Sequence, residues 1–237
     1  MGRPWVMHQA WNDLLFAHWQ VEPDRLQPLV PLPLDLFDGM AWVAVVPFWM
    51  SRIHLRRLPP VPGTHTFPEL NLRTYVRVGG RPGVWFFSLD AASRPAVEVA
   101  RRLFHLPYYH ARMQIRPEGD GFVYQSERRD PRGGPARFAA RYRPSGPVRQ
   151  ATPGSLEHWL TERYALYARS RAGRFYRGEI DHLPWPLQPA EAEITENSIA
   201  AAAGFDLPGG RPLLHYARHL SVRIWPLLRL SDSQMEL

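Results

Sequence analysis

Hydrophobic and polar residues alternate most regularly in the segment from Glu69 to Arg77. At the two-residue period of a β-strand, one face carries only polar or amphipathic side chains: Glu69, Asn71, Arg73, Tyr75 and Arg77. The other face carries Leu70, Leu72, Thr74 and Val76. This pattern predicts a strand with two unlike faces.

A glycine-rich break at 79–83 separates this strand from a second one, predicted over Val84–Asp90. The two strands form a hairpin with a loop longer than two residues. The polar face of the first strand has two interpretations at this point. It either orients a ligand inside a curled sheet or is an ordinary solvated face.

Further strands are predicted on both sides of this hairpin. Trp11–Val21 is the first, and Met40–Met50 is apolar on both faces, with Pro47 placing its second half at an edge or a bulge. Shorter strands follow at 110–116, 122–128, 137–143, 175–183 and 213–224.

Helical periodicity is clearest in Arg94–His105, with Ser93 as the cap and Pro95 in the first turn. Its apolar face, expected to pack on the sheet, is Val97, Ala100, Leu103 and Phe104. Further helices are predicted at 25–30, capped by Asp24, at 155–168 and at 196–203. The segment 51–68 is predicted to be a long surface excursion over a cavity mouth, and the tail 231–237 to be frayed.

Together these elements predict an α+β fold with a curled, mainly antiparallel sheet. A length of 237 residues is sufficient for one sizeable core, and no internal repeat or domain boundary is visible. We therefore expect a single domain over residues 1–237.

The composition narrows the possible chemistry. All 29 basic side chains are arginine, because the sequence contains no lysine, and there is no cysteine. Disulfides, thiolate nucleophiles and thiolate metal sites are therefore excluded. The net charge of +7 is compatible with nucleic-acid binding, but the arginines are scattered, so a nucleic-acid partner is not expected.

The N-terminal segment lacks the continuous apolar run of a secretory signal, since Asn12, Asp13 and His18 interrupt it. No window has the length needed to span a bilayer. We expect a cytoplasmic protein without a membrane partner.

Four segments together resemble the YqjF-like family of uncharacterised conserved proteins, which is similar in fold to acetoacetate decarboxylase. The segments are Phe16–Trp19, Phe67–Val76, Gly83–Asp90 and Leu106–Tyr109. The resemblance implies a barrel- or cone-like sheet around a central cavity, with helices at its flanks. It also implies that the polar face of Glu69–Tyr75 looks into that cavity.

The decarboxylase reaction itself does not fit this sequence. That mechanism needs a lysine amine with a depressed pKa to form a Schiff base. In the decarboxylases this lysine follows a helix, at the place where this chain has Leu106–Tyr109. A Schiff-base decarboxylase is therefore excluded, and whether the chain is an enzyme at all stays open.

The candidate site is a pocket for a small anionic molecule. We expect Arg73 to hold a carboxylate or phosphate, Glu69 to act as a base or orienting partner, and Asn71 to orient the ligand. Ser88 and Tyr108 are further ligand-binding candidates. The alternative is that Glu69 and Arg73 form an ion pair on one strand face, although about 13 Å of backbone separates them.

Other chemistries have weaker support. His215 and His219 share a strand face, but no carboxylate completes a metal motif. His105 and His110 flank a predicted turn, and neither a nucleophile elbow nor a phosphate-binding loop is present. We therefore expect neither a metal nor a cofactor.

Two functions of different classes remain. The first is binding of a small anionic organic molecule in the cavity, with acid–base lyase or hydrolase chemistry as an extension. The second is a protein-interaction or regulatory module whose interior is filled by its own aromatic side chains. Empty volume beside Arg73 distinguishes them; self-association is compatible with both.

Overall fold

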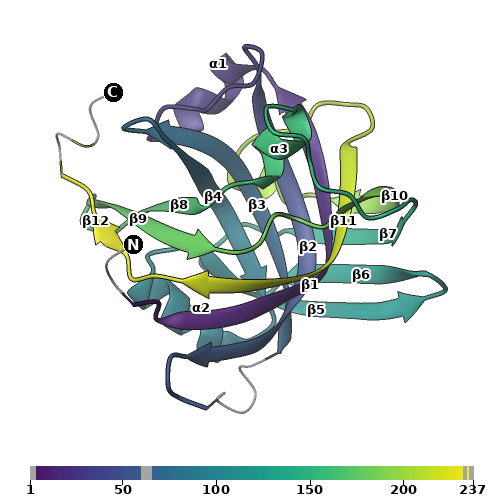
Figure 1. Ribbon diagram of the computed structural model, residues 1–237, viewed down its shortest axis with the longest axis horizontal. Helices are drawn as coiled ribbons and strands as arrows, with labels where there is room; N and C mark the ends of the chain where they lie inside the picture. The colour runs from purple at the N-terminus through teal and green to yellow at the C-terminus, as the bar shows by residue number, and fades with distance from the viewer. Residues whose placement is uncertain (1–3, 60–65, 232–233, 235–237) are drawn as a thin grey trace.

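The computed structural model describes residues 4–59, 66–231 and 234 (Figure 1). Its described part contains twelve strands that belong to one sheet. The strands are β1 (Met7–Val21), β2 (Ala41–Leu55), β3 (Phe67–Val78), β4 (Arg81–Ala91), β5 (Tyr108–Glu118), β6 (Gly121–Arg128), β7 (Arg137–Pro144), β8 (Ala165–Arg169), β9 (Phe175–Asp181), β10 (Leu187–Asn197), β11 (Leu213–Ile224) and β12 (Leu228–Arg229). The helices are α1 (Pro23–Leu26), α2 (Arg94–Leu103) and α3 (Leu156–Thr161), with 3-10 turns at Gln27–Leu29 and Ala201–Ala203.

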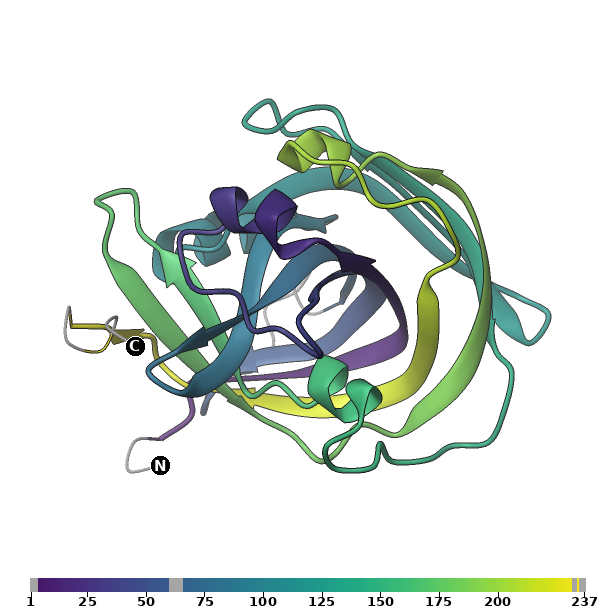
Figure 2. The same cartoon turned by 90° about the horizontal axis from the view of Figure 1, so that it is seen from above.

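The sheet closes on itself twice, and five strands belong to both closures. β4, β3, β2, β1 and β11 form a shared wall, in that order. A smaller ring is completed by β9 and β8, because β9 pairs with β11 and β8 pairs with β4. A larger, nine-stranded ring is completed by β10, β7, β6 and β5, because β5 also pairs with β4. Figure 2 shows the strands curling around an interior.

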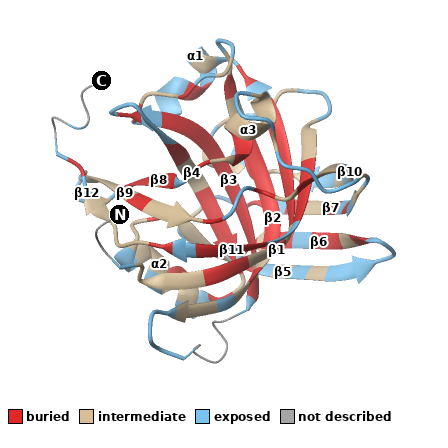
Figure 3. Cartoon of the chain, viewed as in Figure 1, coloured by how far each residue is buried: buried red, intermediate tan, exposed pale blue. Residues whose placement is uncertain are grey.

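The shared wall is covered on both faces, and therefore β2 and β3 are buried along most of their length (Figure 3). The face toward the larger ring carries the main apolar cluster, which includes Leu70, Leu72, Tyr124, Phe138 and Tyr216. These side chains fill the larger ring. The opposite face looks into the smaller ring.

The predicted fold class is confirmed. The sheet is curled and mainly antiparallel, and only β4–β5 and β4–β8 are parallel pairs. Helices are few and short, so the fold is mostly β. The central hairpin is present as β3 and β4, and the last long strand has the predicted bounds, Leu213–Ile224.

The helix predicted over 155–168 is mostly wrong. Ser155 does cap a helix, accepting a hydrogen bond from the backbone N–H of His158, but α3 ends at Thr161. The residues that follow form β8, which hydrogen-bonds with both β4 and β9. Tertiary pairing therefore overrides the helical periodicity of Ala165–Ala168.

β10 was missed by the sequence analysis, which placed irregular chain and a short helix there. The segment Ala190–Ile194 alternates alanine or isoleucine with glutamate, and it pairs with β7. This alternation is a strand signal. Only Ala201–Ala203 has a helical turn, of 3-10 type.

α2 begins as predicted, with the Ser93 hydroxyl accepting from the Ala96 N–H at 3.4 Å, but it ends at Leu103. Val97 is fully buried against the sheet. Leu103, which was expected to pack there too, is 65% exposed. Leu103 lies instead at the mouth of the cavity described below.

Pro47 lies in the interior of the sheet and not at an edge. The pairing of β2 with β1 shifts register between Asn12–Trp49 and Ala17–Val45, a stretch that contains Pro47. The bulge alternative is therefore confirmed. A bulge removes the need for the backbone N–H that proline lacks.

Two predictions lie partly outside the described residues. The excursion at 51–68 includes residues 60–65, and its first residues belong to β2 and its last to β3. The tail at 231–237 is described only at 231 and 234. Among the described residues, no helix is long and apolar enough to span a bilayer.

Candidate functional site

The polar face of β3 points into the smaller ring. Glu69, Asn71 and Arg73 are buried, with 2%, 7% and 8% of their surface exposed. The neighbouring strand β2 places an apolar residue opposite each one, and Phe48 is opposite Glu69. Polar side chains of this size are rarely buried without partners. The local sequence therefore builds a polar stripe into an apolar enclosure.

A cavity of about 600 Å³ lies beside this stripe. Its volume is within the range of small-molecule sites. It is enclosed by the smaller ring and by α2, and no residue of β6, β7 or β10 lines it. The polar or aromatic lining residues are Gln9, Trp11, Phe48, His54, Phe67, Glu69, Asn71, Arg73, Phe86, Phe104, Tyr108, Thr161, Arg163, His182 and Trp185.

Arg73 lines this cavity and has no carboxylate partner in the part of the chain that the structure describes. Its guanidinium carbon lies 5.3 Å from the ring centre of Phe16 and 5.8 Å from that of Tyr75. Its Nε and Nη2 atoms are buried and have no hydrogen-bond partner. An uncompensated buried charge is costly, so it is retained for a reason other than stability.

Nε and Nη2 form the edge of a guanidinium that binds a carboxylate with two parallel hydrogen bonds. The same edge faces a carboxylate at four other arginines of this chain: Arg77, Arg128, Arg132 and Arg143. At Arg73 that edge has no partner among the described residues, and the residue lines the cavity. The geometry suits a carboxylate supplied by a ligand.

Arg163 is a second arginine at the cavity, but it is anchored. Its Nη1 donates to Asp35 at 2.5 Å and its Nε donates to the carbonyl of Trp159 at 2.6 Å. Its Nη2 is buried and has no partner. One donor of Arg163 therefore remains for a ligand beside the free edge of Arg73.

The Glu69 carboxyl is held in its neutral form. Burial raises its pKa to about 8, and hydrogen bonds with Tyr108 and Asn71 offset only part of that shift. Glu69 Oε2 has no hydrogen-bond partner. At neutral pH the group is mainly a carboxylic acid, which can donate a hydrogen bond to a ligand oxygen.

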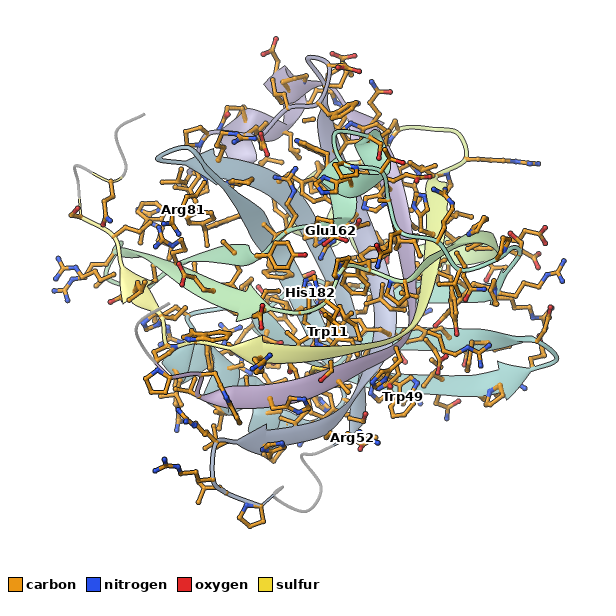
Figure 4. All side chains as sticks on the ribbon, in the orientation of Figure 1. Trp11, Trp49, Arg52, Arg81, Glu162 and His182 are labelled. Atoms are coloured by element: carbon orange, nitrogen blue, oxygen red, sulfur yellow. The ribbon has the colours of Figure 1, made fainter. Side chains whose placement is uncertain are left out.

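His182 presents a base to the same space. Its Nδ1 lies 2.8 Å from the carbonyl oxygen of Leu183, so Nδ1 carries the proton and Nε2 is the acceptor. Burial lowers its pKa, so the ring is neutral at neutral pH, and Nε2 has no partner. The ring centres of His182 and Trp11 lie 6.4 Å apart, and both residues are labelled in Figure 4.

A chain of polar groups lies behind the two arginines. The His18 ring is 2.7 Å from the Tyr75 hydroxyl, and its pKa is lowered by burial, by Arg73 and by His215. His215 in turn lies 3.1 Å from Glu157. These neutral rings add no negative charge, so Arg73 stays uncompensated.

The predicted site residues are only partly brought together. Glu69, Asn71, Arg73 and Tyr108 line one cavity. Ser88 does not line it, because it lies opposite Leu72 in the register and shares the face toward the larger ring. The same-face ion pair of Glu69 and Arg73 does not form among the described contacts.

Sequence reasoning missed Arg163, His182, Trp11 and Trp185. Arg163 was assigned to a helix that does not extend that far, and the others come from β1 and from the segment after β9. Their side chains reach the cavity only because the ring closes. The sequence around a mid-strand tryptophan or a lone histidine does not indicate that its side chain will line a cavity.

A second groove, about 970 Å³ in volume, lies outside β4 and β8 and is lined by arginines, including Arg101, Arg102, Arg169 and Arg171. None of its lining residues carries a buried, unpartnered polar atom. The smaller cavity has several, which distinguishes it as the candidate site. No cluster of three or more potential metal ligands occurs among the described residues.

A family model, DUF2071, described as "Uncharacterized conserved protein", matches residues 8–221. The chain is 48% identical over 229 residues to the "Uncharacterized protein YqjF" of Bacillus subtilis (strain 168), covering 96% of this chain and 93% of the relative. The family resemblance seen in the sequence is thereby confirmed.

Solved structures with the acetoacetate decarboxylase fold are similar across nearly the whole chain. An acetoacetate decarboxylase-like enzyme from Sphingomonas wittichii RW1 aligns with a TM-score of 0.63 and 16% identity, covering 97% of this chain and 94% of that one. The enduracididine biosynthesis enzyme MppR, complexed with pyruvate, aligns with a TM-score of 0.64 and 13% identity, covering 98% and 93%. At this identity the likeness shows a common fold.

Proposed function

This chain belongs to the DUF2071 family of uncharacterised conserved proteins, and we propose that it binds a small organic carboxylate in the cavity of its smaller ring. The observation that carries the proposal is Arg73, a buried arginine that lines the cavity and whose bidentate edge has no partner among the described residues. A ligand carboxylate would supply both the missing charge and the missing acceptors.

The other polar groups fit the rest of such a ligand. The protonated Glu69 can donate to a second oxygen, Arg163 offers one further N–H, and His182 Nε2 accepts. MppR, which has the same fold, was solved with pyruvate, itself a carboxylate. That likeness extends to the fold, so it supports the ligand class by analogy only.

Chemistry at this site would be acid–base chemistry. A neutral carboxylic acid and a neutral imidazole on one cavity are a general acid and a general base at the same pH. A Schiff base is excluded because the chain has no lysine. The proposal itself is that the protein binds a carboxylate, and catalysis would be an extension of it.

The interaction-module alternative requires an interior filled by the protein's own side chains. The larger ring fits that description, but the cavity beside Arg73 supports ligand binding in the smaller ring. Nucleic-acid binding has no comparable support, since many of the exposed arginines form ion pairs, such as Arg112 with Glu127.

A thermal-shift screen with small carboxylates, keto acids and phosphate esters tests the proposal. A ligand that binds only the native state raises the melting temperature. We expect carboxylates to stabilise the wild type and Arg102→Met, a surface control, but not Arg73→Met. Equal shifts in all three proteins, or none in any, would contradict the proposal.

A further inference from the structure

The cavity is polar at one end and apolar at the other. Along β3, the lining side chains run from Arg73 through Asn71 and Glu69 to Phe67. Six residues of extended strand separate Arg73 from Phe67, which is about 20 Å. The polar groups of β3, from Arg73 to Glu69, span about 13 Å of that length, so a ligand as small as pyruvate would leave the end near Phe67 empty.

The walls beyond Glu69 are mainly apolar, and Gln9 and His54 are the polar residues among them. The main contributions come from β2, with Met50 and Ile53, from β3, with Phe67, and from α2. On α2 the lining residues are Ala96, Val99, Ala100 and Leu103. They follow the three- and four-residue spacing of one helix face, so this face is turned to the cavity.

This apolar end reaches the surface. Four of its lining residues are large hydrophobic side chains with more than half of their surface exposed: Leu55 at 52%, Leu58 at 57%, Val99 at 52% and Leu103 at 65%. We call these four residues the rim. Single exposed leucines are ordinary, but a cluster around one opening indicates an apolar binding site.

We propose that the ligand is an amphiphilic carboxylate with an extended apolar chain. Its head group binds the free edge of Arg73, and its chain runs along Phe67 and Met50 to the rim. The inference rests on the proposed function, because it takes the carboxylate at Arg73 as given. What it adds is the chemical class of the remainder of the ligand.

Burial of the ligand's apolar chain should make the binding affinity depend on the length of that chain. Each methylene transferred from water into an apolar wall strengthens binding about two- to fourfold. For linear carboxylates from acetate to dodecanoate, kept below their micellar concentrations, calorimetric titration should show a steady gain until the chain reaches the rim. An affinity that is the same for acetate and decanoate would overturn the inference while leaving the proposed function intact.

Comparison of decanol with decanoate, and of Arg73→Met with the wild type, separates the contribution of the ligand's head group to the affinity from that of its apolar chain. Decanoate should bind the wild type at least tenfold more tightly than decanol does, and Arg73→Met should abolish that difference. If decanol binds as tightly as decanoate, the proposed function fails with the inference. If no carboxylate of any length binds, both also fail.

Two variants test the path of the chain. Ala100→Phe places a ring across the apolar end and should shift the preferred ligand to a shorter carboxylate without weakening butyrate. Val99→Ser should weaken decanoate more than butyrate, whereas Val148→Ser, at a valine that is 61% exposed elsewhere, should change neither. If Val99→Ser changes the oligomeric state on sedimentation and leaves the length dependence unchanged, the rim is a subunit contact and the inference is wrong.

Discussion

Arg73 and Arg128 are both buried arginines, but their surroundings differ. Arg128 donates to Asp90 at 2.7 Å and packs 4.3 Å from the ring centre of Tyr109. Arg73 contacts aromatic rings and has no carboxylate. The first arrangement stabilises the fold, and the second leaves a charge available to a ligand.

This difference predicts opposite effects of the same substitution. Arg128→Met leaves Asp90 buried and unpaired, so the free energy of unfolding should fall by about 3–5 kcal/mol. Arg73→Met removes an uncompensated charge, and the free energy of unfolding should change by less than about 1 kcal/mol or increase. Urea unfolding of both variants measures this. A large loss for Arg73→Met would mean that Arg73 is structural.

Glu69 predicts a pH dependence of stability. Its pKa is about 8 in the folded state and near the ordinary 4.5 in the unfolded chain. Between these values the folded state holds a proton that the unfolded state has lost, so the contribution of Glu69 to stability falls as pH rises. The slope is at most about 1.4 kcal/mol per pH unit.

Glu69→Gln should remove that slope, because an amide does not titrate. The unfolding free energies of the wild type and the variant should be measured from pH 5 to pH 8.5. Their difference isolates the contribution of Glu69, because the buried histidines are the same in both proteins. Their difference should change steadily with pH up to about pH 7 and begin to level off as the pH rises through 8. A difference that is flat throughout would show that Glu69 is ionised in the folded protein.

At the scale of elements, the ring closure is what assembles the site. β8 and β9 complete the smaller ring, and the segments before β8 and after β9 carry Arg163 and His182. Glu162 fastens this region, since its Oε1 accepts from the Trp185 N–H at 2.9 Å. The site therefore depends on two short strands that lie far from β3 in the sequence.

The parallel contact between β4 and β8 gives a prediction at this scale. Gly83 lies so close to β8 that a Cβ would meet the Ala165 carbonyl oxygen at 2.8 Å and the Tyr167 ring at 2.6 Å. Gly83→Ala should lower the free energy of unfolding by about 1–3 kcal/mol.

Gly209→Ala is the matched control, since a Cβ there meets nothing within 4 Å. Its effect should be within about 0.5 kcal/mol. Guanidinium unfolding of the two variants makes the comparison. Equal stabilities would mean that β8 moves away from β4 without cost.

The elements that were predicted well have strong local signals. The β3–β4 hairpin and β11 combine alternation with glycine or proline breaks, and α2 has a cap and a first-turn proline. β8 was not predictable, because its short segment continues a helical period and becomes a strand only through pairing with β4 and β9. β10 was predictable from its alternating glutamates and was overlooked.

The same distinction applies to the candidate site. Arg73 and Glu69 follow from one alternating strand, and Tyr108 from the family resemblance. The candidate Ser88 lies outside the cavity, because it is opposite Leu72 and β4 shifts register beside Arg73, which no pattern in the sequence reveals. His182 depends on closure of the ring.

At the scale of the whole molecule, two rings share one wall and differ in their contents. The larger ring is filled by aromatic and aliphatic side chains and supplies most of the core. The smaller ring keeps a cavity lined by buried polar atoms without partners. The main core and the proposed binding site therefore lie on opposite faces of the same five strands.

The central claim of this account is therefore that a ligand carboxylate binds to Arg73. We would titrate octanoate into the wild type and Arg73→Met by calorimetry at pH 6.5, where Glu69 is protonated. The account predicts saturable binding of one octanoate to the wild type and at least tenfold weaker binding to Arg73→Met. Binding of equal strength to the two proteins, or none to the wild type, would contradict it.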